Sequence, residues 1–391
     1  MKRFVAVAVG IGPPETMGGN TKILLEVLRN FPEAIECLVI TSKPETFEAN
    51  GILPRKGLRI LPVPALGKME IYHPFSSAWH YTKHMTPVFL ENKVGAGDVV
   101  FCVSDFFCDF IPAFLLQKRL GFTWVPAFFL FVPTVFENVR KRYGFPVFRY
   151  IAAYIQQRFT RRLALTRCSG VVVTNGLDKE QFPLRLREKV FPVYGGVNVE
   201  QIPDLDVRER EYDVVYCGRL HPQKGADGLL DIWRLVVDAI PSARLAVIGN
   251  GEPGYEKRLR EKAARLKLDQ NVKWLGYVNN EAKYDIYKQS SIFVHCSVYD
   301  NNGMVAAEAL CSGLPVVMYD LPQLRHVYRD GCVKVPERDK RGFAACIIRL
   351  LSDPDFYRSA VPTEAHVAQL RDMWCWENRA RLFIDFVSEL T

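Results

Sequence analysis

The sequence predicts an α/β protein made of two Rossmann-like domains, each with a parallel sheet. Short, continuous apolar runs alternate with helical segments along the chain, as expected for strands that are buried on both faces. The alternation is interrupted at the polar segment 197–213, which contains Pro203 and has no periodicity. The chain has 391 residues, 49% of them hydrophobic, which is enough for two large cores.

Each predicted strand is a short apolar run bounded by polar or turn residues. In the first half these runs are 3–9, 35–41, 58–63, 98–104, 125–131, 170–175 and 190–195. In the second half they are 213–218, 244–249, 272–276, 291–296, 314–319 and 331–335. Helical periodicity lies between them, for example over 20–31, 145–167, 255–266 and 304–310.

The predicted domains are 1–200 and 201–373. A strongly amphipathic helix follows at 374–391, and it either caps the second domain or crosses back to the first. The apolar N-terminal stretch stops at Pro13 and lacks a small-x-small cleavage site, so we interpret it as a buried strand. No apolar run reaches the roughly 18 residues that a membrane-spanning helix needs.

The charge is distributed unevenly. The net charge is +8, with 25 Lys and Arg against 15 Asp and Glu in residues 1–196, and 26 against 28 in the rest. An anionic partner of the N-terminal half is therefore expected. The ten cysteines are scattered without a C-x-x-C pair, which favours reduced core thiols in a cytosolic protein.

Three loops of the second half follow predicted strands and precede helices, which is where parallel sheets bind ligands. The loop 217–225 carries Arg219 and Lys224 before a helix, a combination suited to a diphosphate. The loop 248–254 reads G-x-G-x-x-G, and its glycines would let backbone approach a ligand. The segment 297–317 contains an Asn-Asn-Gly turn that enters a helix whose first amides can bind an anion.

The glycine pattern of 248–254 does not by itself indicate a dinucleotide. That fingerprint expects an acidic residue at the end of the next strand, where it would bind ribose hydroxyls. Here the next strand ends in Gly276 and Tyr277, and the motif follows the second strand of its domain. The pattern therefore favours another phosphate ligand over NAD or a flavin.

Taken in order, "GRLHPQKG", "IGNGEPG" and "DNNGMVAAEALCSGLPVV" resemble the donor site of retaining GT-B glycosyltransferases, family 4. The bacterial phosphatidylinositol mannosyltransferases belong to that family. Its hallmark Glu-x7-Glu is matched here by Asp300 and Glu308. The resemblance is strongest over residues 190–320, and "GPPETMGGNTK" resembles the family's first glycine-rich loop. It implies a GT-B fold with two domains facing a cleft, and a terminal helix that packs back onto the first domain.

The resemblance also implies roles for individual residues. Arg219, Lys224 and Asp300 would be catalytic: the two cations would bind the donor diphosphate, and Asp300 would hold hydroxyls of the sugar. Glu308 would bind the nucleotide ribose. The remaining donor-binding residues would be Gly18, Gly19, Gly249, Gly251, Tyr277, Val278, Asn301, Asn302, Gly303, Met304 and Val305.

Two features depart from the family pattern. Asp300 is one methylene shorter than the usual Glu, and the stretches 100–110 and 124–133 lack the His that often faces the donor sugar. Helix-end amides and two cations can stabilise charge that develops on a leaving diphosphate, so no metal and no cofactor is expected. The triplet Asp353-Pro-Asp355 matches Asp-x-Asp by spacing, but it lies in a turn-like stretch.

Residues 138–177 contain eight basic residues and no acidic one, interleaved with aromatics. The residues Phe148, Ile151, Ile155 and Phe159 share one helical face. Three interpretations remain: a core helix with a solvated basic back, a surface for anionic lipid, or a nucleic-acid surface. The resemblance favours lipid over nucleic acid. The residues of such a membrane surface would be Arg149, Arg158, Arg161 and Arg162.

The sequence thus predicts a retaining, metal-independent hexosyltransferase that uses a UDP- or GDP-sugar and a lipid-linked, glycolipid or polysaccharide acceptor. We expect a cytoplasmic protein, peripheral on the inner face of the membrane if the basic segment contacts lipid. The alternative is a catalytically silent sugar-nucleotide-binding or scaffold protein with the same fold. Replacing Glu308 or Lys224 by Ala should remove donor affinity or rate and leave the fold intact.

Overall fold

The computed structural model describes residues 1–391 apart from 13, 15–17, 68–72, 135, 137–146 and 204–209. The described residues form two compact units. The first holds the residues up to Gly195 together with Trp376–Thr391, and the second holds Gly196–Cys375. The boundaries expected from the sequence, after residues 200 and 373, lie close to these positions.

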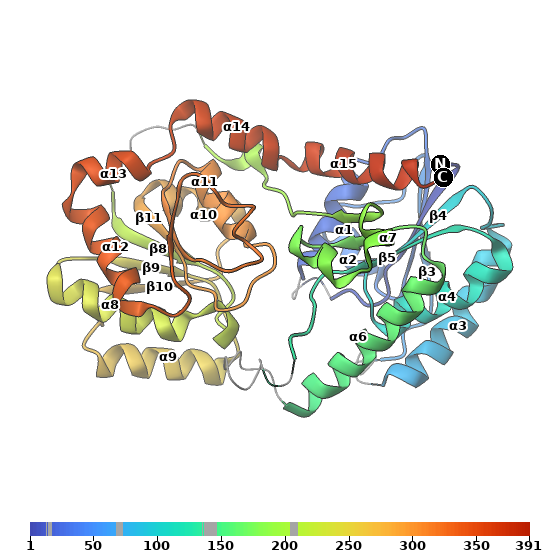
Figure 1. Cartoon of the computed structure of the whole chain (residues 1–391), viewed down its shortest axis with the longest axis horizontal. Coiled ribbons are helices and arrows are strands. Elements are labelled where there is room, and N and C mark those ends of the chain that lie inside the picture. Colours follow the sequence, from blue (N-terminus) through green and yellow to red (C-terminus); the bar gives the residue numbers. More distant parts are fainter. Residues whose placement is uncertain (13, 15–17, 68–72, 135, 137–146, 204–209) are drawn as a thin grey trace. The chain divides into compact units, whose positions relative to one another are not determined.

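The first unit is built on a seven-stranded parallel sheet in the order β3-β2-β1-β4-β5-β6-β7. Its strands are β1 (Arg3–Val7), β2 (Glu36–Thr41), β3 (Leu58–Pro62), β4 (Asp98–Cys102), β5 (Thr123–Phe128), β6 (Val171–Val173) and β7 (Val190–Pro192). The central strands β1 and β4 are almost wholly buried, because helices cover both faces of the sheet (Figure 1).

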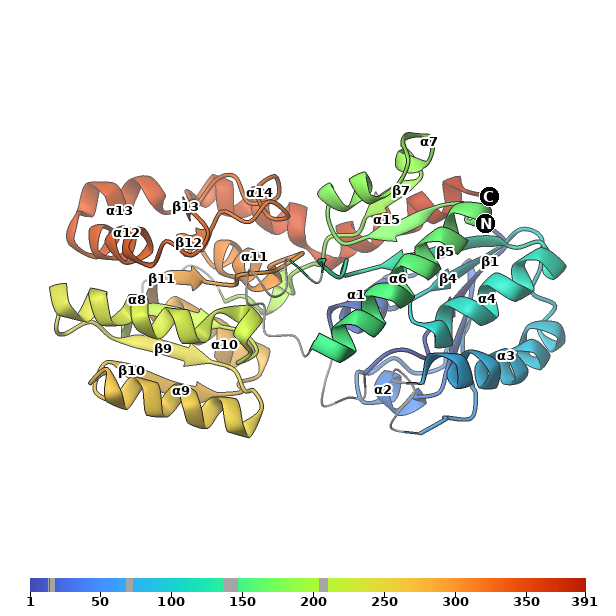
Figure 2. The same cartoon turned by 60° about the horizontal axis from the view of Figure 1, so that its bottom comes forward.

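Helices α3 (Pro74–Glu91), α4 (Phe107–Leu120) and α6 (Val147–Arg167) pack side by side on one face of this sheet (Figure 2). On the other face, α1 (Gly19–Arg29) packs against the terminal helix α15 (Trp376–Glu389). The short helices α2 (Pro44–Glu48) and α7 (Leu184–Arg187) complete the unit. Phe383 of α15 contacts the rings of Phe4, Phe101 and Phe191, which attaches the C-terminal helix to the strands of the first unit.

The second unit contains a six-stranded parallel sheet in the order β10-β9-β8-β11-β12-β13. Its strands are β8 (Tyr212–Cys217), β9 (Leu245–Ile248), β10 (Val272–Gly276), β11 (Ser290–His295), β12 (Val316–Tyr319) and β13 (Cys332–Val335). Its helices are α8 (Ala226–Ala239), α9 (Pro253–Arg265), α10 (Asn280–Lys288), α11 (Met304–Cys311), α12 (Lys340–Ser352), α13 (Pro354–Ala360) and α14 (Glu364–Trp374). Every strand expected from the sequence overlaps one of the observed strands, so the prediction of two Rossmann-like parallel-sheet domains is confirmed.

Helix α6 packs in a way that the sequence pattern does not indicate. Its buried face is formed by Gln157, Thr160 and Ala164, while Ile155 and Phe159 are 61% and 47% exposed. The hydrogen bonds of Gln157 explain why this face is the buried one. Its side chain accepts from Val132 N and donates to Leu130 O and Asp105 Oδ2, each at 2.8 Å. The apolar face that the periodicity indicates, which includes Ile155 and Phe159, is therefore not the face that α6 buries. None of the helices among the described residues is both long and apolar enough to span a bilayer.

Candidate functional site

The loops after β8, β9 and β10 are joined by backbone hydrogen bonds at the carboxyl edge of the second sheet. Gly218 N donates to Ile248 O (3.0 Å), and Gly249 N donates to Gly276 O (2.7 Å). A Cβ on Gly249, whose φ is +131°, would lie 2.0 Å from Gly218 O, and one on Gly251 would lie 2.1 Å from Leu220 O. Only glycine fits at these two positions, because the backbone of the loop after β8 comes too close for a Cβ. Whether they also contact a nucleotide stays a prediction.

Lys224 and Asp300 are brought together from two loops that lie 76 residues apart in the sequence. Lys224 ends the short 3-10 helix η4 (Pro222–Lys224) after β8, and its Nζ lies 2.6 Å from Asp300 Oδ2 after β11. Gln223 reinforces the contact between the loops: its Nε2 donates to Tyr299 O (2.9 Å), and its carbonyl accepts from Val298 N (3.0 Å). Two of the three predicted catalytic groups, Lys224 and Asp300, therefore lie together at the edge of the sheet.

The Asp300 carboxylate is buried, and both of its oxygens are engaged by the protein. Oδ1 accepts from the backbone N–H groups of Asn302 (3.3 Å) and Gly303 (3.1 Å). Oδ2 faces Lys224, His295 Nε2 (3.1 Å) and the Ser297 hydroxyl (3.3 Å). Burial by itself would raise the pKa of Asp300, but the charge of Lys224 and the bond to His295 outweigh it and hold this pKa well below its usual value. To hold a sugar hydroxyl, as predicted, Asp300 would have to exchange one of these partners.

The loop between β8 and η4 is electropositive. Arg219 is exposed, two residues beyond the end of β8. The pKa of His221 is lowered by burial and by the charges of Arg219 and Lys224. The two cations of this loop, rather than the burial of His221, favour an anionic ligand over a cationic one.

The N-terminus of α11 is shaped by the Asn301-Asn302-Gly303 turn. Both asparagines are buried, and Gly303 adopts a left-handed conformation (φ +61°) directly before the helix. The Tyr328 hydroxyl lies 2.8 Å from Asn302 O and 2.9 Å from Gly303 O, and these hydrogen bonds stabilise the turn. Met304 and Val305, half-buried, begin the helix, so the positive end of its dipole lies next to the Lys224–Asp300 pair.

Glu308 lies one turn further along α11, and its charge is balanced by a residue that sequence reasoning missed. Lys283 of α10 places its Nζ 2.8 Å from Glu308 Oε2, and both side chains are more than nine-tenths buried. Removing Glu308 alone would leave the Lys283 ammonium in the core. The expectation that Glu308→Ala leaves the fold intact is therefore not supported, because breaking a buried ion pair is strongly destabilising.

The remaining predicted donor-binding residues fall in three places. Tyr277 follows β10 and is 78% exposed, and Val278 beside it is half-buried. Gly18 is the N-cap of α1 and Gly19 its first residue, so both belong to the first unit, whereas the residues described above belong to the second. Besides Lys283, sequence reasoning also missed His221, which lies between Arg219 and Lys224, and His295, which lies five residues before Asp300, because no motif assigns a role to either ring.

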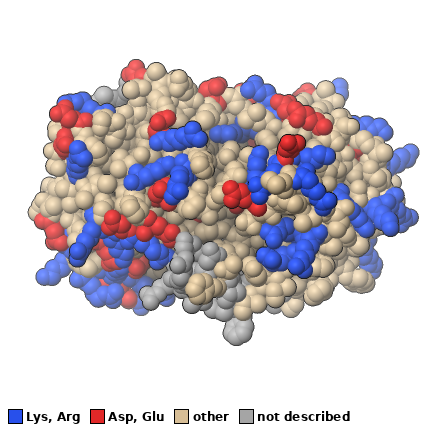
Figure 3. Space-filling model, viewed as in Figure 1, with Lys and Arg blue, Asp and Glu red and all other residues tan. Residues whose placement is uncertain are grey.

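The predicted membrane surface is distributed over α6. Arg158 and Arg162 are exposed, and Arg161 is half-buried and donates to Gln181 Oε1 (2.9 Å). Figure 3 shows Lys and Arg side chains gathered over α6 and α7. The side chain of Arg149 lies outside those that the structure describes, as does that of Phe148.

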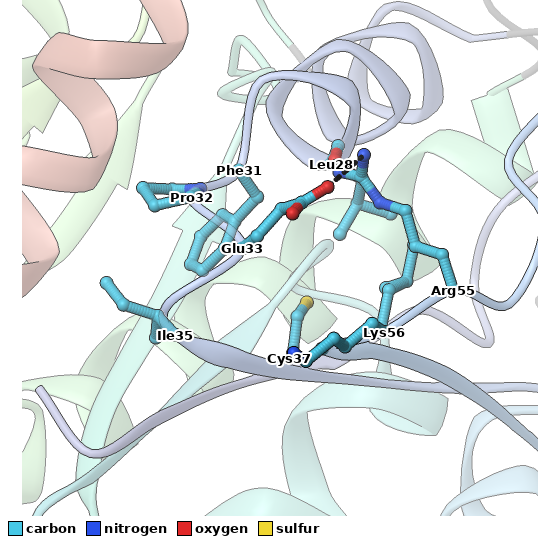
Figure 4. Close-up of a pocket in the computed structure, with 10 residues that line it drawn as sticks. Leu28, Phe31, Pro32, Glu33, Ile35, Cys37, Arg55 and Lys56 are labelled. Carbon is cyan, nitrogen blue, oxygen red and sulfur yellow. Dashed lines mark hydrogen bonds and ion pairs between the residues drawn. The ribbon is translucent and has the colours of Figure 1, made fainter.

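Two further features are structural. A cavity of about 10 Å³ in the first unit, lined by Phe31, Cys37 and Arg55 among others (Figure 4), is about the size that holds one water molecule. Asp353 accepts from the backbone of Asp355 and Phe356 and caps α13. Within the described ranges, no group of three or more His, Cys, Asp or Glu side chains is arranged to hold a metal ion.

Comparison with known proteins identifies the class of fold first. The sucrose-phosphate synthase of Thermosynechococcus elongatus superimposes with a TM-score of 0.77 at 17% identity, covering 99% of both chains. The Anabaena protein HepE, crystallised with UDP and glucose, superimposes with a TM-score of 0.71 at 15% identity, covering 99% of this chain and 100% of HepE. The chain therefore has the GT-B fold, as predicted.

A family model matches the second unit. Residues 198–365 match the model of the glycosyl transferases group 1. The phosphatidyl-myo-inositol mannosyltransferase of Mycobacterium leprae is 31% identical over 207 residues, which cover 51% of this chain and 52% of the relative. The chain spans about half the length, or less, of the curated relatives that it matches. The resemblance drawn from the donor-site motifs is thus confirmed.

Proposed function

We propose that the protein is a retaining glycosyltransferase that moves a sugar from a nucleoside diphosphate to a lipid-linked, glycolipid or polysaccharide acceptor. One observation carries the proposal. Lys224, the paired acid Asp300 and the N-terminus of α11 meet at the carboxyl edge of the second sheet, inside the segment that matches the family. A cation and helix-end amides at one place suit a diphosphate leaving group.

The proposed chemistry needs only groups of this chain and of its substrates. The bond between the anomeric carbon and the diphosphate oxygen breaks while the acceptor oxygen attacks the same face of the sugar. Arg219, Lys224 and the first amides of α11 stabilise the negative charge that builds on the diphosphate. The leaving phosphate oxygen accepts the acceptor's proton. Glu308 would bind ribose hydroxyls, and Lys283 holds its carboxylate in place.

A ligand screen by thermal shift tests the donor site. The purified chain is heated with UDP, GDP, ADP, their common sugar conjugates and NADH. A ligand at a hundred times its dissociation constant adds about 2.7 kcal/mol of stability, which is a visible rise in midpoint. A rise with one nucleoside diphosphate and none with NADH is expected. A rise with NADH alone would contradict the proposal.

Product analysis separates an enzyme from the alternative, a catalytically silent sugar-nucleotide-binding protein. The chain is incubated with the stabilising sugar nucleotide, with and without acceptor extracts, and release of the nucleoside diphosphate is followed. Transfer with retained anomeric configuration supports the proposal. Binding without transfer or donor hydrolysis would favour the silent protein.

We propose further that α6 and its neighbours bind an anionic membrane surface, where the protein reaches its acceptor. The apolar face of α6 is exposed, beside Arg158 and Arg162. On α3, which packs on the same face with α4 next to both helices, Phe75 and Trp79 are 80% and 70% exposed, and Lys83 lies over the Trp79 ring (5.6 Å). Large exposed aromatics next to cations are typical of surfaces that dock on lipid.

Vesicle sedimentation tests this surface. Each basic residue near an anionic membrane contributes about 1 kcal/mol, so changing Arg158, Arg161 and Arg162 to Gln should weaken binding to phosphatidylserine vesicles about 100-fold. The matched control changes three cations of α9 to Gln, namely Lys257, Arg258 and Arg260, and should have little effect. Equal effects in both variants, or a stronger preference for single-stranded RNA than for vesicles, would contradict the proposal.

A further inference from the structure

His295 ends β11, the strand that lies between β8 and β12 in the second sheet. Its ring is 3% exposed, and its Nε2 faces Asp300 Oδ2 at 3.1 Å, which requires the proton on Nε2. Its Nδ1 has no hydrogen-bond partner in the described structure. The ring also lies under the turn: a Cβ on Gly303 would come within 3.5 Å of Nε2. The Ser297 hydroxyl also lies 3.4 Å from Nε2, so the bond to Asp300 is the shorter of the two contacts of this buried ring.

Asp300 and the proposed diphosphate compete for the same cation. In the structure Lys224 Nζ lies 2.6 Å from Asp300 Oδ2, and the proposed function gives Lys224 to the leaving phosphate. Once phosphate oxygens draw the ammonium away, Oδ2 retains His295 and Ser297, the latter at 3.3 Å. His295 provides the shorter of these two contacts. It is also fixed by the strand that carries it, whereas Lys224 is a flexible chain.

The position of Asp300 determines the shape of the turn before α11. Oδ1 of the same carboxylate accepts from the N–H groups of Asn302 and Gly303. A carboxylate that rotated after losing Lys224 would release these two amides and change the entry into the helix. A second anchor on Oδ2 prevents this rotation. Because the Asp300 side chain is short, its carboxylate lies close enough to accept from both the turn amides and His295 at the end of β11.

We infer that His295 is a positioning residue that keeps Asp300 in place when the donor diphosphate engages Lys224. The inference rests on the proposed function, and it gives the shortened acid of this chain a partner from β11. In the free protein Lys224 holds Asp300 as well, so His295 matters most in the nucleotide-bound state. A residue with a purely structural role would matter equally in both states.

Two amide variants test the inference, His295→Gln and His295→Asn. Both are polar and differ by one methylene, and only Gln reaches far enough to replace the Nε2–H donor. A hydrogen bond to a charged group corresponds to about 10- to 100-fold in an equilibrium. We therefore expect His295→Asn to weaken binding of the stabilising nucleoside diphosphate, and kcat/KM for its sugar conjugate, by about 10- to 100-fold. His295→Gln should restore most of the wild-type values.

The melting midpoint separates positioning from folding. Without ligand, the two variants should melt at similar temperatures, while the rise caused by nucleoside diphosphate should be smaller in His295→Asn. Equal nucleotide binding by both variants and the wild type would overturn the inference. So would equal losses in both variants that follow a lower midpoint of the ligand-free protein. A wild-type chain that neither binds nor transfers would overturn the proposed function first, before any variant is compared.

Discussion

The buried pair of Lys283 and Glu308 allows structural and functional roles to be separated by mutation. Its Nζ–Oε2 distance is 2.8 Å, and the side chains are 9% and 4% exposed. Glu308→Ala would leave a buried ammonium, and removing one partner of such a pair costs about 3–5 kcal/mol. For a unit of this size each kcal/mol lowers the midpoint by about 2–4 °C, so a fall of roughly 6–20 °C is expected.

The double variant Lys283→Met/Glu308→Leu removes both charges and keeps similar volume. Replacing a buried pair with apolar residues is often neutral, so this variant should recover most of the lost stability. Its affinity for nucleoside diphosphate should nevertheless stay low, because the proposed ribose contact is gone. Calorimetry of the wild type, Lys283→Met, Glu308→Leu and the double variant gives the coupling energy. Isothermal titration with the nucleotide gives the affinities.

The pair of Arg234 and Asp238 provides the control, since it lies in the same unit at the same 2.8 Å separation but with Asp238 62% exposed. Asp238→Ala should cost only about 0.3–0.5 kcal/mol. A loss below about 1 kcal/mol for Glu308→Ala would refute the energetic argument, as would a double variant no more stable than the single one. Wild-type nucleotide affinity in the double variant would refute the ribose assignment.

Three other predictions follow from described contacts. Lys224→Met should weaken nucleoside diphosphate binding at least about tenfold by titration calorimetry, since a charge-assisted contact is lost, and unchanged affinity would exclude Lys224 from the site. Gly225→Ala should abolish stable folding of the second unit, judged by circular dichroism, because its Cβ would lie 1.9 Å from Cys296 O at φ +77°; a stable, native-like variant would contradict this geometry. Burial raises the pKa of Asp178 to about 7, so its stabilising contribution is complete below its unfolded pKa and is lost as pH rises from about 4 to 7. Asp178→Asn should flatten that part of the melting profile, and an unchanged slope would count against the shifted pKa.

Helix α6 shows where sequence patterns reach their limit. Its apolar residues Ile151, Ile155 and Phe159 recur with helical periodicity, which by itself is equally compatible with a core face. The structure instead buries Gln157, because the amide side chain binds the backbone of residues 130 and 132 after β5. Periodicity shows which residues share a helical face but not what that face packs against. The sequence therefore could not decide whether the apolar face of α6 is buried or exposed.

The sequence by itself determined the two parallel-sheet units, since short apolar runs such as 98–104 and 291–296, with helical segments between them, are typical of strands that are covered on both faces. It also determined the order of the loops that carry Lys224, Asp300 and Glu308. Only the tertiary structure decided the partners of these residues. Lys283 reaches Glu308 because α10 and α11 both pack against β11, and His295 at the end of β11 reaches Asp300 in the loop that follows. Such contacts depend on how whole helices and strands pack, so they cannot be inferred from the spacing of residues in the sequence.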